Sequence, residues 1–119
     1  HLGRYAEVDI GLDAFPFNGS TTTFQALWMG VPVVSLDGDT FISRAAGSIL
    51  HHAGLNELIA DTPDAYVACA QALAEDFDRL KTLRAGLRAR METSALCDAP
   101  AYAKSLEAAY LSMWQLWCG

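Results

Sequence analysis

Residues 9–34 constrain the fold more than any other stretch, because they contain two strand patterns joined by a loop and a helix pattern. Apolar residues alternate with polar or small ones over residues 9–13, and a second β-branched run follows Pro32 over residues 33–36. Between them, Phe24, Leu27 and Trp28 have the spacing of one helix face. A strand–helix–strand unit predicts a parallel sheet with a right-handed crossover. Ligands of such sheets bind beyond the carboxyl ends of the strands.

The loop at that edge, residues 18–23, reads NGSTTT and leads into the helix. It offers a flexible glycine, four hydroxyl groups and the free backbone N–H groups of a helix N-terminus, a combination that suits a phosphate. Neither the GxGxxG pattern of dinucleotide folds nor the GxxxxGK[ST] pattern of P-loops is present. In the alternative interpretation, Thr21 and Thr22 only cap the helix.

Glycines mark the ends of the predicted helices. Gly30 ends the first helix, and Gly54 ends a second one over residues 41–53, for which Asp39 or Thr40 is the candidate cap. A short third strand is predicted over residues 58–60, followed by helices over residues 62–76, 78–91 and 98–117. The fold class is therefore α/β, a partial Rossmann-like parallel sheet with a helical C-terminal tail. We expect residues 1–61 to form a nucleotide-diphosphate-binding βαβ part and residues 62–119 the C-terminal helices.

The last predicted helix carries a wide aromatic stripe at spacings of three and four residues. Its members are Tyr102, Leu106, Tyr110, Met113, Trp114 and Trp117. A stripe of this width needs a larger surface than this chain offers, so we expect part of it to pack against another part of the parent protein.

Composition excludes several classes of function. The formal net charge is −6 and no cluster of Lys and Arg is present, which disfavours a nucleic acid or an anionic membrane as partner. No apolar run approaches the ~20 residues of a membrane span. Cys69, Cys97 and Cys118 lie far apart without the spacing of a zinc site, which indicates free thiols of a cytoplasmic protein and no metal. The chain opens at His1 without Met, which we interpret as a cut.

Six segments, taken together, resemble the C-terminal part of the O-GlcNAc transferase family, including its SPINDLY-like members and its bacterial relatives with TPR repeats. They are HLGRYAEVDIGLD, NGSTTT, ALWMGVPVV, SRAAGSIL, GLNELIA and AYAKSLEAAYLSMW, in family order. The resemblance implies the GT-B fold, in which two Rossmann-like lobes face each other. This chain would be the C-terminal portion of the C-lobe, which holds the nucleotide diphosphate.

The resemblance also implies residue roles at the diphosphate. Thr21 and Thr22 match the paired threonines that hold it with hydroxyl groups and backbone amides. Ser20 stands where the animal enzymes have a histidine, which implies a weaker phosphate role.

For the nucleoside, His1 and Arg4 match positions that line the base pocket. Gln25 matches an acidic position that engages the ribose, and here the sequence departs from the family. A carboxylate accepts from two hydroxyls, whereas the Gln amide accepts through its carbonyl and donates through its NH₂ group.

The activity implied by the resemblance is inverting transfer of a sugar from a nucleotide sugar to Ser or Thr hydroxyls of a protein acceptor. UDP-GlcNAc is the leading donor and GDP-fucose, used by SPINDLY-like relatives, the alternative; no cofactor or metal is required. In the family, a lysine helps to stabilise the leaving diphosphate, and histidines are proposed to activate the acceptor. The matching positions would lie upstream of His1, as would the other lobe and the TPR repeats. We therefore expect no catalytic residue in this chain and no activity from it alone. The competing hypothesis is a non-catalytic scaffold, favoured by Gln25.

Four further polar residues have structural interpretations. Asp13, at a strand end, is predicted to hold a turn. Arg44 either reaches the phosphate side or, as we favour, pairs with Asp37 or Asp39. His51 and His52, at a helix end, are predicted to complement the helix dipole.

Overall fold

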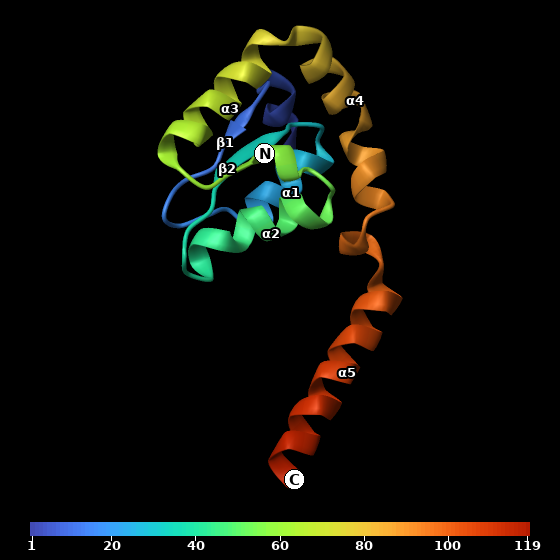
Figure 1. Cartoon of the computed structure of the whole chain (residues 1–119). Helices are drawn as coiled ribbons and strands as arrows, with labels where there is room; N and C mark the ends of the chain where they lie inside the picture. The colour runs from blue at the N-terminus through green and yellow to red at the C-terminus, as the bar shows by residue number, and fades with distance from the viewer.

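The structure is a computed structural model that describes all residues 1–119, and its strands form one parallel sheet flanked by helices (Figure 1). The strands are β1 (Gly11–Leu12), β2 (Val33–Leu36) and β3 (Ile59–Ala60). The α-helices are α1 (Thr21–Trp28), α2 (Ala45–His52), α3 (Pro63–Glu75), α4 (Phe77–Glu92) and α5 (Ala99–Cys118). Four short 3-10 helices are η1 (Leu2–Glu7), η2 (Ile42–Arg44), η3 (Asn56–Leu58) and η4 (Ala95–Cys97).

The strand order is β1-β2-β3, with all neighbours parallel. Gly11 pairs with Val33 and Ser35 pairs with Ile59. The central strand β2 is buried along its whole length, and helices α1, α2 and α3 all contact it. In Figure 1 the strands lie between α3 and the pair α1 and α2. The predicted α/β class with a parallel sheet and a helical C-terminal end is confirmed.

One hydrophobic core joins the sheet to its helices. Its fully buried leucines come from α1, α2, η3 and the residue before it, α3 and α4: Leu27, Leu50, Leu55, Leu58, Leu73 and Leu87. Both parts of the chain, residues 1–61 and residues 62–119, therefore contribute to the same core, and their division by function stays a prediction.

The glycines predicted to end helices and the residues predicted to cap the starts of α3 and α5 are confirmed. Gly30 and Gly54 have φ angles of +80° and +71°, the left-handed conformation that ends a helix at low cost only with glycine. Thr62 accepts a hydrogen bond from the Ala65 N–H at the start of α3, and Asp98 accepts one from the Ala101 N–H at the start of α5.

The single helix predicted over residues 41–53 is wrong in its first part. Thr40 Oγ1 accepts from the Ser43 N–H, Ser43 Oγ accepts from the Thr40 N–H, and the Gly38 N–H donates to the Ser43 carbonyl. These hydrogen bonds close a tight turn, so a 3-10 turn at Ile42–Arg44 precedes the regular helix from Ala45. The strand predicted over residues 9–13 is also shorter, at Gly11–Leu12.

Helix α5 extends away from the rest of the molecule in Figure 1. None of its residues is buried, and Trp114 and Trp117 are 64% and 86% exposed. The expectation that its aromatic stripe packs on a further part of the protein stays a prediction. No helix of the structure combines the length and the apolar character needed to span a bilayer.

Candidate functional site

The start of α1 forms the centre of the candidate site, because the parallel sheet places it beside the carboxyl end of β1. Ser20 is the N-cap residue, but its side chain makes no capping hydrogen bond. The predicted cap at Thr21 or Thr22 is therefore wrong, since both threonines lie inside the first turn. Their side chains are exposed, whereas the Thr23 side chain is buried.

The first turn of α1 also offers unused backbone donors. The N–H groups of Thr21, Thr22 and Thr23 donate no hydrogen bond within the chain, and the first bond of the helix runs from the Phe24 N–H to the Ser20 carbonyl. These groups carry the positive end of the helix dipole. A hollow of about 570 Å³ is lined by Ser20, Thr21, Thr22 and the loop that precedes them. This arrangement can bind an anion with several oxygen atoms, such as a phosphate.

Side chains hold the preceding loop in shape. The turn role predicted for Asp13 is confirmed, because its Oδ1 accepts from the Gly19 N–H at 2.7 Å. Asn18 is 3% exposed, and its Nδ2 donates to the Ala14 carbonyl while its N–H donates to the Ile42 carbonyl. The loop is thus attached both to the strand before it and to η2.

The other predicted ligand residues do not gather at this loop. His1 and Arg4 lie in or next to η1 with exposed side chains, and Gln25 lies partly buried on the second turn of α1. None of the three lines the large hollow or the smaller one of about 160 Å³ beside it. Their base and ribose roles therefore stay predictions.

The smaller hollow is lined by Tyr5, which the sequence analysis had not singled out, together with Thr22 and Asp13. The His1 and Tyr5 rings meet edge to face, with centroids 6.1 Å apart. No sequence pattern identified Tyr5, because the 3-10 conformation of η1 has no marked periodicity in this short segment.

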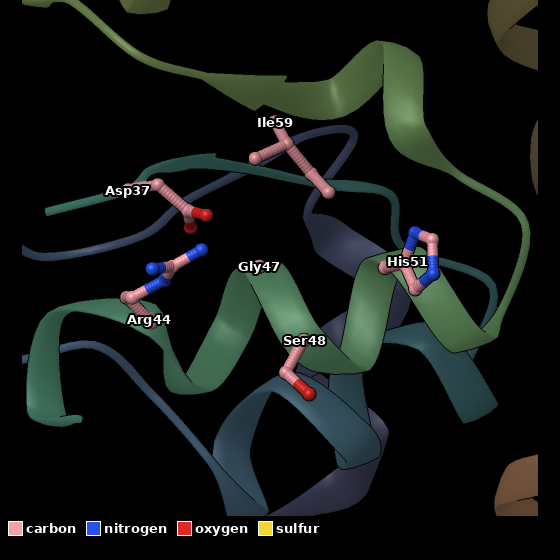
Figure 2. A pocket seen from close by; sticks show the side chains of 6 residues that line it. All are labelled: Asp37, Arg44, Gly47, Ser48, His51 and Ile59. Atoms are coloured by element: carbon pink, nitrogen blue, oxygen red, sulfur yellow. The ribbon is translucent and has the colours of Figure 1, made fainter.

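A third hollow, of about 440 Å³, lies between α2 and the ends of β2 and β3 (Figure 2). Asp37 follows β2 directly, and Figure 2 shows Arg44 of η2 pointing toward its carboxyl group. The predicted ion pair of Arg44 with Asp37 or Asp39 is nevertheless absent, because the ion pairs of the chain are Arg84–Asp9 and Arg88–Glu92.

The Asp37 carboxyl group is held against the backbone of α2. Its Oδ1 is buried without a hydrogen-bond partner, and a Cβ atom on Gly47 would lie 1.9 Å from it. Burial raises the pKa of Asp37, and the positive charge of Arg44 lowers it by less. The ionised carboxylate is therefore poorly accommodated here.

This raised pKa makes a prediction for stability. Ionisation of Asp37 lowers the free energy of unfolding as pH rises from the unshifted pKa of 3.8 through the raised pKa. The neutral variant Asp37→Asn avoids this loss, so we expect it to raise the melting temperature at pH 7 and to change it less near pH 4. Scanning calorimetry at both pH values measures the difference. Asp39→Asn, at an exposed carboxyl group in the same loop, is the control. A lower melting temperature of Asp37→Asn at pH 7 would mean that attraction to Arg44 outweighs burial.

At the end of α2, His51 Nδ1 lies 2.7 Å from Asn56 Oδ1, and His52 Nδ1 lies 2.8 Å from the Ser48 carbonyl oxygen. Both rings thus have local partners at a helix C-terminus. No three His, Cys, Asp or Glu side chains of the chain come together in a group that could hold a metal ion.

Comparison with known proteins agrees with this fold. Residues 1–106 match the model of glycosyl transferase family 41. Relatives named "Probable UDP-N-acetylglucosamine--peptide N-acetylglucosaminyltransferase SPINDLY" are 42% identical in Hordeum vulgare and 41% identical in Arabidopsis thaliana, each over 99% of this chain. The chain spans only 12% and 13% of their respective lengths.

A solved structure, a mutant of the O-GlcNAc transferase of Thermobaculum terrenum, superposes with a TM-score of 0.87 and 41% sequence identity. The match covers 95% of this chain and 22% of that one. The match to the family model over most of the chain, the relatives and the superposed structure show that this chain belongs to glycosyl transferase family 41.

Proposed function

We propose that this chain is the donor-binding end of a protein O-glycosyltransferase, and that the loop at the start of α1 binds the diphosphate of a nucleotide sugar. One observation carries the proposal: exposed hydroxyl groups and unused backbone N–H groups of Thr21 and Thr22 adjoin a hollow at the carboxyl edge of a parallel sheet. The names of the relatives support UDP-GlcNAc as the donor and a protein as the acceptor.

In this function, the start of α1 stabilises negative charge. Transfer of the sugar leaves a nucleoside diphosphate, whose charge grows as the glycosidic bond breaks. Thr21 and Thr22, with a weaker contribution from Ser20, donate hydrogen bonds to its oxygen atoms, and the helix dipole adds to their effect. The transfer inverts the sugar's anomeric configuration and needs no metal. His1, Arg4 and Gln25 are assigned to the base and the ribose.

The chain contains no group assigned to the acceptor hydroxyl, so in this proposal it is inactive alone. The remaining catalytic residues belong to the facing lobe of a longer cytoplasmic protein with TPR repeats. The exposed aromatic stripe of α5 supports such a lobe, because Trp114 and Trp117 have no apolar neighbour surface within this chain that buries them.

Titration with UDP and, separately, with GDP tests the proposal, with the amide resonances of residues 19–23 as the readout. A Cβ atom at Gly19 would lie 2.6 Å from Thr22 Oγ1 and 2.8 Å from Thr23 Oγ1. Gly19→Ala therefore displaces these hydroxyl groups, and we expect it to weaken nucleotide binding at least about tenfold.

Gly86→Ala is the matched control, because a Cβ atom there has no neighbour within 4 Å. It lies in α4, where alanine favours the helix by about 1 kcal/mol, and binding should not change. Stronger binding of UDP than of GDP supports the UDP-GlcNAc donor, and the reverse supports GDP-fucose. Absence of binding to this chain and to a longer protein that includes the facing lobe would contradict the proposal and favour the scaffold.

A further inference from the structure

Asp13 uses each of its oxygen atoms to hold a different part of the site. It follows β1 directly, and its Oδ1 accepts from the Gly19 N–H at 2.7 Å. Its Oδ2 accepts from the Ser35 hydroxyl of β2 at 2.9 Å. Ser35 is completely buried, so this carboxylate oxygen is fixed to the centre of the sheet. Hydrogen bonds to an ionised carboxylate are stronger than those between neutral groups.

The backbone of Asp13 is held from the other side. The Tyr66 hydroxyl of α3 donates to the Asp13 carbonyl oxygen at 2.9 Å. Burial raises the pKa of the Tyr66 phenol, and the negative charge of Asp13 raises it further. The phenol therefore keeps its proton at neutral pH and remains a donor. Asp13 is thus connected to β2, α3 and the loop at once.

These contacts determine which backbone N–H groups face the ligand. The Gly19 N–H turns toward Asp13, so it is not available to a bound anion. The N–H groups of Thr21 and Thr22 remain without partners, and both residues line the hollow. Without the Asp13 carboxylate, no other side chain of the structure binds the Gly19 N–H.

We infer that Asp13 is the positioning residue of the diphosphate loop. It closes the loop at Gly19 and thereby orients the free N–H groups at the start of α1 toward the ligand, without donating to the ligand itself. The inference rests on the proposed function, because it concerns the geometry of the same site. A carboxylate cannot donate to a diphosphate, and its charge opposes that of the ligand, so direct binding does not explain its presence beside the hollow.

Two substitutions of Asp13 separate its geometry from its charge. In Asp13→Asn the amide carbonyl can still accept from the Gly19 N–H, and the NH₂ group can donate to the Ser35 hydroxyl. In Asp13→Ala both connections are lost. We expect Asp13→Ala to weaken binding of UDP and of inorganic pyrophosphate about tenfold, because it loses two hydrogen bonds that hold the loop. Asp13→Asn should stay within about twofold of the wild-type affinity, because it can keep both.

The test is an NMR titration of this 119-residue chain with both probes. The Gly19 amide proton resonance is a second readout, because the loss of its acceptor in Asp13→Ala moves it toward the position of a water-exposed amide. Tyr66→Phe is the control for a merely structural role. It removes the hydrogen bond to the Asp13 carbonyl oxygen and lowers stability, but it leaves the carboxylate contacts and should leave the affinity of the folded chain unchanged.

The outcomes distinguish this inference from the proposed function. If the wild-type chain binds UDP and folded Asp13→Ala binds it equally well or more tightly, Asp13 does not position the loop while the diphosphate site stands. Equal weakening in Asp13→Ala and Tyr66→Phe would assign Asp13 to fold stability alone. If the wild-type chain binds neither probe, the same titration is made on a longer protein that includes the facing lobe. Absence of binding there as well means that the proposed function fails, and the inference about Asp13 fails with it.

Discussion

Replacing Leu50 with alanine is expected to lower the free energy of unfolding by about 2–5 kcal/mol, the range for a buried leucine that leaves a cavity. Leu50 lies on α2, is completely buried and belongs to the single core of the molecule. That core also holds Leu27 of α1 and Leu87 of α4, so several elements of the fold contribute to it. Because these elements fix one another, the core cannot easily collapse into the cavity that Leu50→Ala leaves. Urea unfolding followed by circular dichroism measures the change.

Leu116→Ala is the matched control for Leu50→Ala. Leu116 lies on α5 and is 84% exposed, so removal of the same atoms creates no cavity. We expect its effect on the free energy of unfolding of this chain to stay within about 0.5 kcal/mol. Equal effects of the two substitutions would contradict the burial of Leu50 in the core that α2 shares with the sheet.

The double substitution Thr21→Ala/Thr22→Ala is expected to lower the kcat/KM of the longer transferase about 100- to 1,000-fold. This prediction rests on the proposed function, in which the two hydroxyl groups donate to the leaving diphosphate; removal of such preorganised donors has effects of this size. Both side chains are exposed at the start of α1, so alanine should disturb the fold little. Transfer of the sugar to a peptide acceptor is the measurement, with melting temperatures of both proteins recorded alongside.

Thr82→Ala is the control, because Thr82 is exposed on α4 and lines a different hollow. Its kcat/KM should match the wild type. If the double variant keeps full activity, the two hydroxyl groups do not donate to the leaving diphosphate, and their proposed role is wrong. If wild-type and variant proteins are both inactive although they are folded, the scaffold interpretation is favoured.

Much of the fold was predictable from local patterns. The alternation before residue 13 and the β-branched run at Val33 predicted parallel strands, and Gly30 and Gly54 predicted helix ends, because only glycine adopts a positive φ at low cost. The boundaries were less predictable. At Thr40 and Ser43, reciprocal side-chain hydrogen bonds to the backbone compete with the regular helix and delay its start.

The sequence alone determined that Ser20, Thr21 and Thr22 lie where a helix begins beyond a parallel strand, since turn formers and hydroxyl residues act over a few positions of the chain. Only the tertiary structure decided how that loop is held. Asp13 meets Ser35 and Tyr66 across 22 and 53 positions, and no local pattern encodes such separations. Likewise, Arg44 points toward Asp37 without forming an ion pair, and the Asp37 carboxyl group lies against Gly47 of α2. This arrangement depends on how α2 packs on β2, which the charges in the sequence do not determine.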